Sequence, residues 1–356
     1  MGERVYLRPT AFVDAPFGHD GKVARLAGGL LWFSAVELLR VADNRLMAEL
    51  VPVEGIETRL DEPGRAAWEN ITRPRPPLNL GDRTIRLDQP QVVGIVNVTP
   101  DSFSDGGAHE DPSAAIKAGH DMAAAGAAIV EIGGESTRPG SKPVWEQDEI
   151  GRVLPVVRQL AGAGTALSLD TRKAAVMEAA LGAGVRMVND VSALTFDERS
   201  AGVVAQAGCP VVLMHHQGTP ETMQQSPHYH RPVLAEVYDW LEQRIEAAVA
   251  AGIDRTRIVV DPGIGFGKNV QHNLQLLNGL SLLHGLGCPI MLGASRKRMI
   301  GALAGEAPAD KRLAGSLALA LKGADQGVQL LRVHDVPETV QALKVWRGLR
   351  DAALTP

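Results

Sequence analysis

Cysteine, aromatic residues and long apolar runs are all scarce in this sequence of 356 residues. Its 2 cysteines, Cys209 and Cys288, each precede a proline at the head of an apolar stretch. We therefore expect buried thiols in a reducing compartment rather than a disulfide or a metal-binding pair. The longest apolar stretch, residues 26–39, is short and interrupted by Glu37, so no segment is expected to span a bilayer.

Targeting signals and a strong net charge are also lacking. The first residues, MGERVYLRP, contain no apolar signal core, and Tyr6 stands where a myristoylation motif requires Ser or Thr. The net charge of −5 creates no field that would attract nucleic acid or a membrane surface. These absences predict a cytoplasmic protein whose partners are small molecules.

The length of the chain suits a barrel of about 250 residues together with one additional module. Residues 1–80 contain short apolar runs broken by Gly and Pro and no catalytic pattern, so we expect a small N-terminal α+β module there. Its proline-rich residues 73–77 indicate a stiff linker, and residues 81–356 are expected to form the catalytic domain. Trp32 and Phe33 need a burial partner, either within the module or on the outer helices of the barrel.

From residue 92 onward one unit recurs eight times: a short apolar strand, a polar loop and an amphipathic helix. The predicted strands are residues 92–99, 127–134, 166–171, 186–192, 210–216, 257–263, 289–295 and 328–336. The predicted helices are residues 113–125, 148–161, 173–181, 199–207, 233–250, 270–283, 313–322 and 338–349. Eight such units predict an α/β fold, a (β/α)8 TIM barrel, with a doubly wound open sheet as the alternative.

A polar residue lies at the end of every predicted strand. In chain order these residues are Asn97, Glu131, Asp170, Asn189 with Asp190, His215, Asp261, Ser295 and His334. A single buried Asp or His is usually a satisfied core group. The core of such a barrel is built from branched apolar side chains, however, so polar groups at eight strand ends predict a cup lined with carboxylates and amides.

The loops that follow the strands add cations and one isolated aromatic residue. The cations are Arg138, Lys268, Lys297 and Arg332, and in an acidic protein they imply an anionic substrate. Residues 295–298 also open a helix, whose first N–H groups favour an anion, although Arg296 suits a solvated charge. Phe103 lies in a polar, Gly-rich loop and has nothing to bury against unless that loop closes over a ligand.

Eight motifs, in this order and spacing, resemble the dihydropteroate synthase family. They are NVTPDSFSDGG, IGGESTRPG, LDT, NDVS, MHHQG, DPGIGFGKN, GASRK and RVHDV. The resemblance runs from about Gln91 to the last helix and does not extend to the N-terminal module. It implies a homodimeric, sulfonamide-sensitive enzyme of folate biosynthesis. Such an enzyme condenses 6-hydroxymethyl-7,8-dihydropterin diphosphate with 4-aminobenzoate to give 7,8-dihydropteroate and diphosphate.

The resemblance also implies a role for particular residues. The pterin would lie against Asp170, Asn189, Met214, Asp261, Gly265, Phe266 and Lys297. The diphosphate would be held by Asn97, Arg138, Arg332, His334 and a Mg²⁺ ion bound by Asn97. The 4-aminobenzoate pocket would consist of Phe103, Ser104, Thr137, Arg138, Pro139, Lys297 and Arg298. The residues closest to the chemistry would be Asn97, Asp170, Lys297, Arg332 and His334.

Two positions depart from the family pattern. Arg298 stands where many members have Ser, and it would either pair with the aminobenzoate carboxylate or point away. His216 stands where the neighbour of the strand-end residue is often apolar.

Three other functions remain open. A pterin-binding methyltransferase that passes a methyl group to a corrinoid shares the fold and the Asn and Asp contacts, but we would not expect it to carry both FSDGG and SRK. A Schiff-base aldolase with Lys297 as nucleophile is compatible with any barrel, although Arg296 and Arg298 suit anion binding better. A binding protein without activity would keep the cup and lose the loops, which are intact here.

Overall fold

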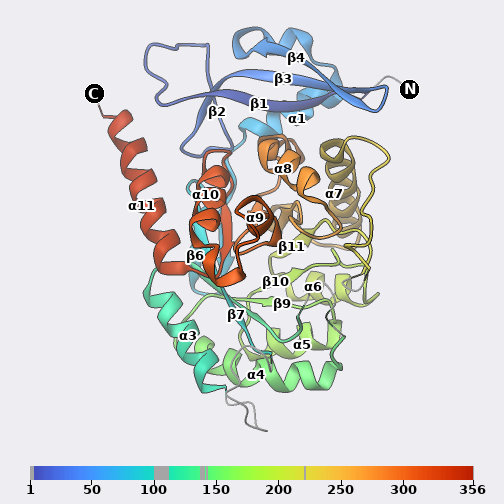
Figure 1. Ribbon diagram of the computed structural model, residues 1–356, viewed down its shortest axis with the longest axis vertical. Helices are drawn as coiled ribbons and strands as arrows, with labels where there is room; N and C mark the ends of the chain where they lie inside the picture. The colour runs from blue at the N-terminus through green and yellow to red at the C-terminus, as the bar shows by residue number, and fades with distance from the viewer. Residues whose placement is uncertain (1–3, 100–111, 137–140, 142, 220–221, 356) are drawn as a thin grey trace.

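The computed structural model describes residues 4–99, 112–136, 141, 143–219 and 222–355. Figure 1 shows two parts: a barrel of strands ringed by helices, and a smaller module packed on one side of it. The predicted α/β barrel with an added N-terminal module is confirmed.

Eight parallel strands form the barrel. They are β7 (Gln91–Asn97), β8 (Ile129–Gly133), β9 (Leu167–Asp170), β10 (Met187–Asp190), β11 (Val211–Met214), β12 (Ile258–Asp261), β13 (Met291–Leu292) and β14 (Leu330–Val333). Each is bonded to the next around the sheet, in the order β12-β11-β10-β9-β8-β7-β14-β13. A parallel bridge between Val260 and Ile290 joins the two ends, so the sheet closes and the open-sheet alternative is wrong.

The helices that cover the barrel lie close to their predicted positions. They are α3 (Ser113–Ala124), α4 (Glu146–Gly162), α5 (Ala174–Ala183), α6 (Ser200–Ala207), α7 (Val233–Ala250), α8 (Val270–Asn278), α9 (Arg298–Leu303), α10 (Leu313–Ala324) and α11 (Val336–Ala353). The helix predicted for residues 270–283 instead stops at Asn278, and a 3-10 helix, η3 (Leu280–Leu286), follows Gly279. Within the described ranges, no helix has the length and apolar character needed to cross a membrane.

The N-terminal module is an antiparallel sheet with one α-helix. Its elements are β1 (Tyr6–Val13), β2 (Ala24–Arg25), β3 (Trp32–Ala42), β4 (Arg45–Pro52), the 3-10 helix η1 (Val53–Arg59) and α1 (Glu62–Thr72). Strand β3 is central and pairs with the other three. Asp61 begins α1 by accepting a hydrogen bond from the backbone N–H of Gly64 at 2.9 Å, as an N-cap residue does.

The module is attached to the outer helices of the barrel. Phe33 is fully buried in a cluster that also contains Ala324 of α10 and Trp346 of α11. The side chain of Arg75 donates to the carbonyl oxygen of His284 in η3 at 3.0 Å, and the hydroxyl of Tyr6 donates to Asp239 of α7 at 2.9 Å. The apolar residues of the module are thus buried both within it and against the barrel.

A short hairpin between the two parts fills the amino-terminal end of the barrel. Strands β5 (Leu78–Leu80) and β6 (Arg83–Ile85) place four apolar side chains in one cluster with residues from the starts of the barrel strands. The four are Leu78, Leu80, Ile85 and Leu87. The proposed boundary between residues 80 and 81 falls in the turn of this hairpin, so its two strands lie on either side of that division.

Candidate active site

A pocket of about 300 Å³, partly open to solvent, lies at the carboxyl ends of the barrel strands. It is lined by Asp170, Asn189, Val191, Met214, Asp261, Ile264, Phe266, Gly293, Lys297 and Arg332. Seven of these are predicted site residues that come from different strands and loops, and the fold brings them together. None of the described residues of the N-terminal module, 4–80, lines this pocket.

Arg332, on β14, is held by two carboxylates. Its Nη2 donates to Asp170 at 2.7 Å, and its Nε donates to the buried Glu131. Burial raises the pKa of Asp170 to about 7; the positive charge of Arg332 opposes this rise, and the negative charge of Glu131 adds to it. The arrangement places a cation and a proton-accepting carboxylate side by side in the wall of the pocket.

Asp261 ends β12 with its carboxylate in the pocket. Its Oδ1 accepts a hydrogen bond from the backbone N–H of Gly263 at 2.7 Å. Gly263 has φ of +66°, and a Cβ there would lie 1.8 Å from the carbonyl oxygen of His215, so only glycine fits. Burial raises the pKa of Asp261 to about 6, opposed by the Gly263 N–H and by the charges of Lys297, Arg332 and Lys268.

Phe266 and Lys297 form one wall of the pocket. The ammonium group of Lys297 lies 4.2 Å from the centre of the Phe266 ring, a cation–π contact. Gly265 lies behind this wall without lining the pocket, and its φ of +86° is in the left-handed region that favours glycine. The carbonyl oxygen of Gly265 accepts a hydrogen bond from the side chain of Gln224 at 2.6 Å, which fixes the loop.

Lys268 does not lie where the sequence suggested. The sequence predicts that Lys268 meets an anionic substrate, but its side chain is buried behind the pocket and does not line it. Its ammonium group lies 2.8 Å from Nδ1 of His215 and donates to the carbonyl oxygen of Phe266 at 3.0 Å. The turn at Gly265 and Gly267, both with positive φ, directs the chain inward, and that direction cannot be read from residue types.

Asn97 and His334 lie beside the pocket without lining it. Gly133 separates Asn97 from Asp170: a Cβ on Gly133 would be 3.8 Å from Oδ1 of Asn97 and 3.9 Å from Oδ2 of Asp170. His334 is oriented by Ser295, whose hydroxyl oxygen lies 3.1 Å from Nδ1 of the ring and accepts the backbone N–H of His334 at 3.2 Å.

Five predicted site residues, Phe103, Ser104, Thr137, Arg138 and Pro139, lie outside the described residues. Arg298 is exposed at the start of α9. Arg296 forms an ion pair with Asp335 instead of standing alone in solvent. His216 packs edge-on against Trp240, with ring centres 5.7 Å apart.

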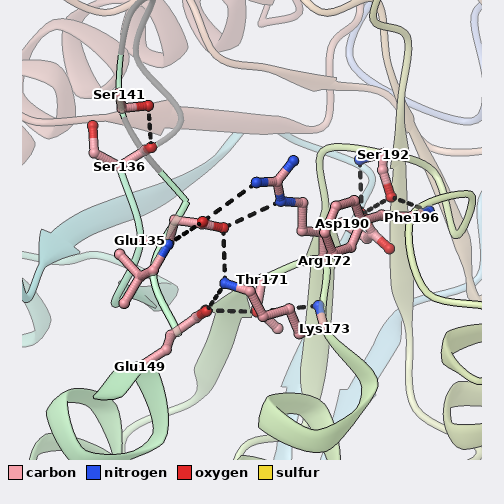
Figure 2. A network of polar contacts seen from close by, with 11 residues as sticks. Glu135, Ser136, Ser141, Glu149, Thr171, Arg172, Lys173, Asp190, Ser192 and Phe196 are labelled. Atoms are coloured by element: carbon pink, nitrogen blue, oxygen red, sulfur yellow. Dashed lines mark hydrogen bonds and ion pairs between the residues drawn. The ribbon is translucent and has the colours of Figure 1, made fainter. Parts of the chain in front are cut away.

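Figure 2 shows a network of charges that sequence reasoning missed, and it includes described residues of the loop between β8 and α4 (residues 134–145, the second loop). Glu135 accepts hydrogen bonds from Arg172 at 3.2 Å and from the backbone N–H of Val144 at 2.9 Å. Lys173 lies between Glu135, at 3.1 Å, and the fully buried Glu149, at 2.5 Å. The network ties residues 135 and 144 to the loop after β9. A carboxylate inside the motif GGEST and the basic pair that follows LDT were the available signals.

The chain is similar in sequence to known pterin-binding enzymes. A family model described as "Pterin binding enzyme" matches residues 93–334, more than half of the chain. Dihydropteroate synthase from Neisseria meningitidis serogroup B is 46% identical over 271 residues, which cover 74% of this chain and 94% of the relative. The chain belongs to the dihydropteroate synthase family.

Solved dihydropteroate synthases share its fold. The structure from Yersinia pestis with a sulfonamide drug complex is 45% identical, covering 77% of this chain and 99% of that one, with a TM-score of 0.73. The structure from Xanthomonas albilineans with 4-aminobenzoic acid is 48% identical. The match covers 78% of this chain and 98% of that one, also with a TM-score of 0.73. The chain is therefore an enzyme of the dihydropteroate synthase family, as predicted, and the methyltransferase alternative is set aside.

Proposed function

We propose that the pocket binds 6-hydroxymethyl-7,8-dihydropterin diphosphate and joins it to 4-aminobenzoate. The bond between the pterin methylene carbon and the diphosphate oxygen breaks, and diphosphate leaves with the electron pair. The aniline nitrogen forms the new bond to the methylene carbon and loses one proton. The observation that carries this proposal is the convergence of Asp170, Asn189, Asp261, Lys297 and Arg332 on one pocket.

The pterin edge suits the carboxylate of Asp261. The 2-amino group and the ring N3–H form a pair of adjacent donors, and a carboxylate is a pair of acceptors. Asn189 meets the neighbouring edge, and Lys297 reaches the carbonyl and N5 side of the ring. Met214 and Phe266 give the flat ring apolar contact on its faces.

The diphosphate leaving group needs positively charged surroundings, and the positive charge that develops on the pterin needs negatively charged ones. We propose that Arg332 and His334 bind the diphosphate, with Arg138 as a further contact. Asp170 offsets the positive charge that spreads into the pterin as the methylene–oxygen bond breaks, because a negative charge in a partly closed site acts strongly.

A Mg²⁺ ion fits beside this pocket. The amide oxygen of Asn97 is a hard ligand close to the carboxylate of Asp170, and Mg²⁺ in such sites takes one or two protein ligands with substrate oxygens and water. When bound, the ion would neutralise charge on the diphosphate. Asn97 would hold it.

The second substrate follows from the loops and the relatives. The Xanthomonas structure contains 4-aminobenzoic acid and the Yersinia structure a sulfonamide drug. We propose that this chain binds both ligands beside Lys297. Phe103, Ser104, Thr137, Arg138 and Pro139 would supply that pocket, and Arg298 is a candidate partner for the carboxylate.

We also propose that the enzyme is a homodimer, as the resemblance implies. The module covers outer surface of η3, α10 and α11, so contact between two copies would use surface that the module leaves open. Light scattering on the full-length chain tests this: a mass near 76 kDa, twice 37.8 kDa, supports the dimer, and a mass of 37.8 kDa contradicts it.

The activity is tested by mixing purified protein with Mg²⁺, the pterin diphosphate and 4-aminobenzoate. The expected result is 7,8-dihydropteroate and diphosphate in equal amounts, each dependent on both substrates. A protein that is folded and binds both substrates but yields no product would contradict the proposal.

A further inference from the structure

Glu131 is a fully buried carboxylate beneath the pocket, and the reaction as proposed gives it no role. It lies in β8 and does not line the pocket. Its Oε2 accepts hydrogen bonds from Nδ2 of Asn189 at 3.0 Å and from the hydroxyl of Ser168 at 3.3 Å. Its Oε1 accepts from Nε of Arg332. One carboxylate thus connects residues from β9, β10 and β14, and two of them line the pocket.

The bond to Glu131 decides which atom Asn189 offers to a ligand. A carboxylate can only accept, so the amide of Asn189 must direct its NH₂ group toward Glu131, whichever way the amide is drawn. The amide oxygen is the polar atom that remains for the pocket. An acceptor in that position selects a ring N–H or amino group and disfavours a ring carbonyl or unprotonated nitrogen.

The same carboxylate orients Arg332. Nε is occupied by Glu131 and Nη2 by Asp170, and neither bond uses Nη1. Two anchors on one planar guanidinium fix its plane and leave its remaining edge for an anion. Asp170 in turn is held through Oδ2, so its other oxygen is the one available to the ring.

We propose that Glu131 is a positioning residue that determines which polar atoms the pocket presents, the amide oxygen of Asn189 and Nη1 of Arg332. The inference rests on the proposed function, because the ligand whose donors it selects is the pterin. Glu131 itself touches no substrate and acts through Asn189 and Arg332.

Glu131→Gln separates this role from simple packing. Glutamine has one acceptor and one donor, so it cannot accept from Arg332 with one atom and from Asn189 with the other. If its oxygen stays with Arg332, its NH₂ group meets Asn189, whose amide rotates and turns a donor toward the donors of the pterin. Calorimetric titration with 6-hydroxymethyl-7,8-dihydropterin should show affinity lower by about tenfold to a hundredfold.

Glu149→Gln is the matched control. Glu149 is also fully buried and bonded to two partners, Thr171 at 2.6 Å and Lys173, but unlike Asn189 and Arg332 neither of these partners lines the pocket. This variant should lose thermal stability and keep its affinity for the pterin within about twofold. An equal loss of affinity in both variants, or unchanged affinity in Glu131→Gln, would overturn the proposal.

A double-mutant cycle adds a second readout. If Glu131 acts through Asn189, Glu131→Gln should lower pterin affinity much less in an Asn189→Ala background than in the wild type. If the two substitutions lower the affinity independently, so that their fold-changes multiply in the double variant, the proposal is overturned. Wild-type protein that binds no pterin would overturn both this inference and the proposed function, whereas wild-type binding with an unaffected Glu131→Gln would overturn the inference alone.

The unaltered protein gives a test that does not depend on the folding of a variant. In a crystal structure with 6-hydroxymethyl-7,8-dihydropterin bound, the pterin atom nearest the amide oxygen of Asn189 should be a nitrogen that carries hydrogen, either N8 or the 2-amino nitrogen. A ring acceptor atom at hydrogen-bond distance from Asn189 would overturn the proposal.

Discussion

The ammonium group of Lys268 lies 2.8 Å from Nδ1 of His215, and both side chains are buried behind the pocket wall. Within the described residues, the hydrogen-bond partners of the Lys268 ammonium group are His215 Nδ1 and the carbonyl oxygens of His215 and Phe266, and none of them is a carboxylate. Burial lowers the pKa of Lys268 from 10.5 to about 7. Burial, together with the neighbouring ammonium group, lowers the pKa of His215 well below its usual value. The pair is held by the loop that carries Phe266.

We predict that Lys268→Met removes part of the pH dependence of stability. Between pH 7 and 10.5 the unfolded chain keeps the lysine proton and the folded chain has lost it, so the unfolded state binds more protons. The contribution of this group to the free energy of unfolding therefore rises with pH in that window. The difference between wild type and variant should increase by up to about 1 kcal/mol per pH unit, measured by urea denaturation.

Lys117→Met serves as control for this experiment, because its side chain is 76% exposed on α3. Lys117→Met should leave the slope of the free energy of unfolding against pH unchanged. A Lys268→Met variant with the same slope as wild type would show that Lys268 keeps an ordinary pKa in the folded protein.

We expect Asp261→Asn to impair pterin binding severely. Asparagine keeps the shape but replaces one of two acceptors with a donor, so a pterin donor meets a donor. The penalty should be about 3 kcal/mol or more, roughly a hundredfold in kcat/KM. In the wild type, affinity should also fall as the pH drops below about 6, where the carboxylate takes up a proton, and the variant should lack this dependence. Near-normal turnover by Asp261→Asn would remove Asp261 from the site.

The strand ends could be predicted from sequence because strand position and side-chain chemistry are both local. Asp170, Asn189 and Asp261 each follow an apolar run, and parallel strands of a barrel present such ends on one face. The closed barrel followed from counting eight units. Which residue lines the pocket and which supports it from below was harder, because Glu131 and Asp170 look alike in sequence.

Other features depend on contacts between distant segments. The direction of Lys268 depends on backbone turns at two glycines and on a histidine 53 positions away. The hairpin β5–β6 is only six residues of strand, and no element is predicted there from the sequence. Its apolar side chains can be recognised as core residues only from the structure of the barrel end that they fill.

We predict that metal and diphosphate precede the second substrate. If Asn97 holds a Mg²⁺ ion that would neutralise charge on the diphosphate, chelation should abolish turnover, and 4-aminobenzoate should bind appreciably only when diphosphate or the pterin diphosphate is present. Titration calorimetry in each order of addition measures this. Tight binding of 4-aminobenzoate to the metal-free protein without diphosphate would contradict this order.

The N-terminal module is predicted to stabilise the barrel without taking part in the chemistry, since no residue of its described part lines the pocket. A shortened chain beginning at Pro76 keeps the hairpin. It should retain condensation and competition by sulfonamides, with a lower melting temperature because Trp346 and its neighbours on α10 and α11 become exposed. A chain beginning at Gly81 loses β5 and should fail to fold. A folded Pro76 chain that binds pterin but makes no product would place the module in the active site.

The most direct test of the whole account is a crystal structure of the protein with Mg²⁺ and 7,8-dihydropteroate. We predict that the pterin ring occupies the pocket, with its amino-pyrimidinone edge on the Asp261 carboxylate and its face against Phe266 and Met214. The aminobenzoate group should extend toward Lys297 and the second loop. A pterin ring bound elsewhere, or an Asp261 carboxylate that contacts no part of it, would contradict the account.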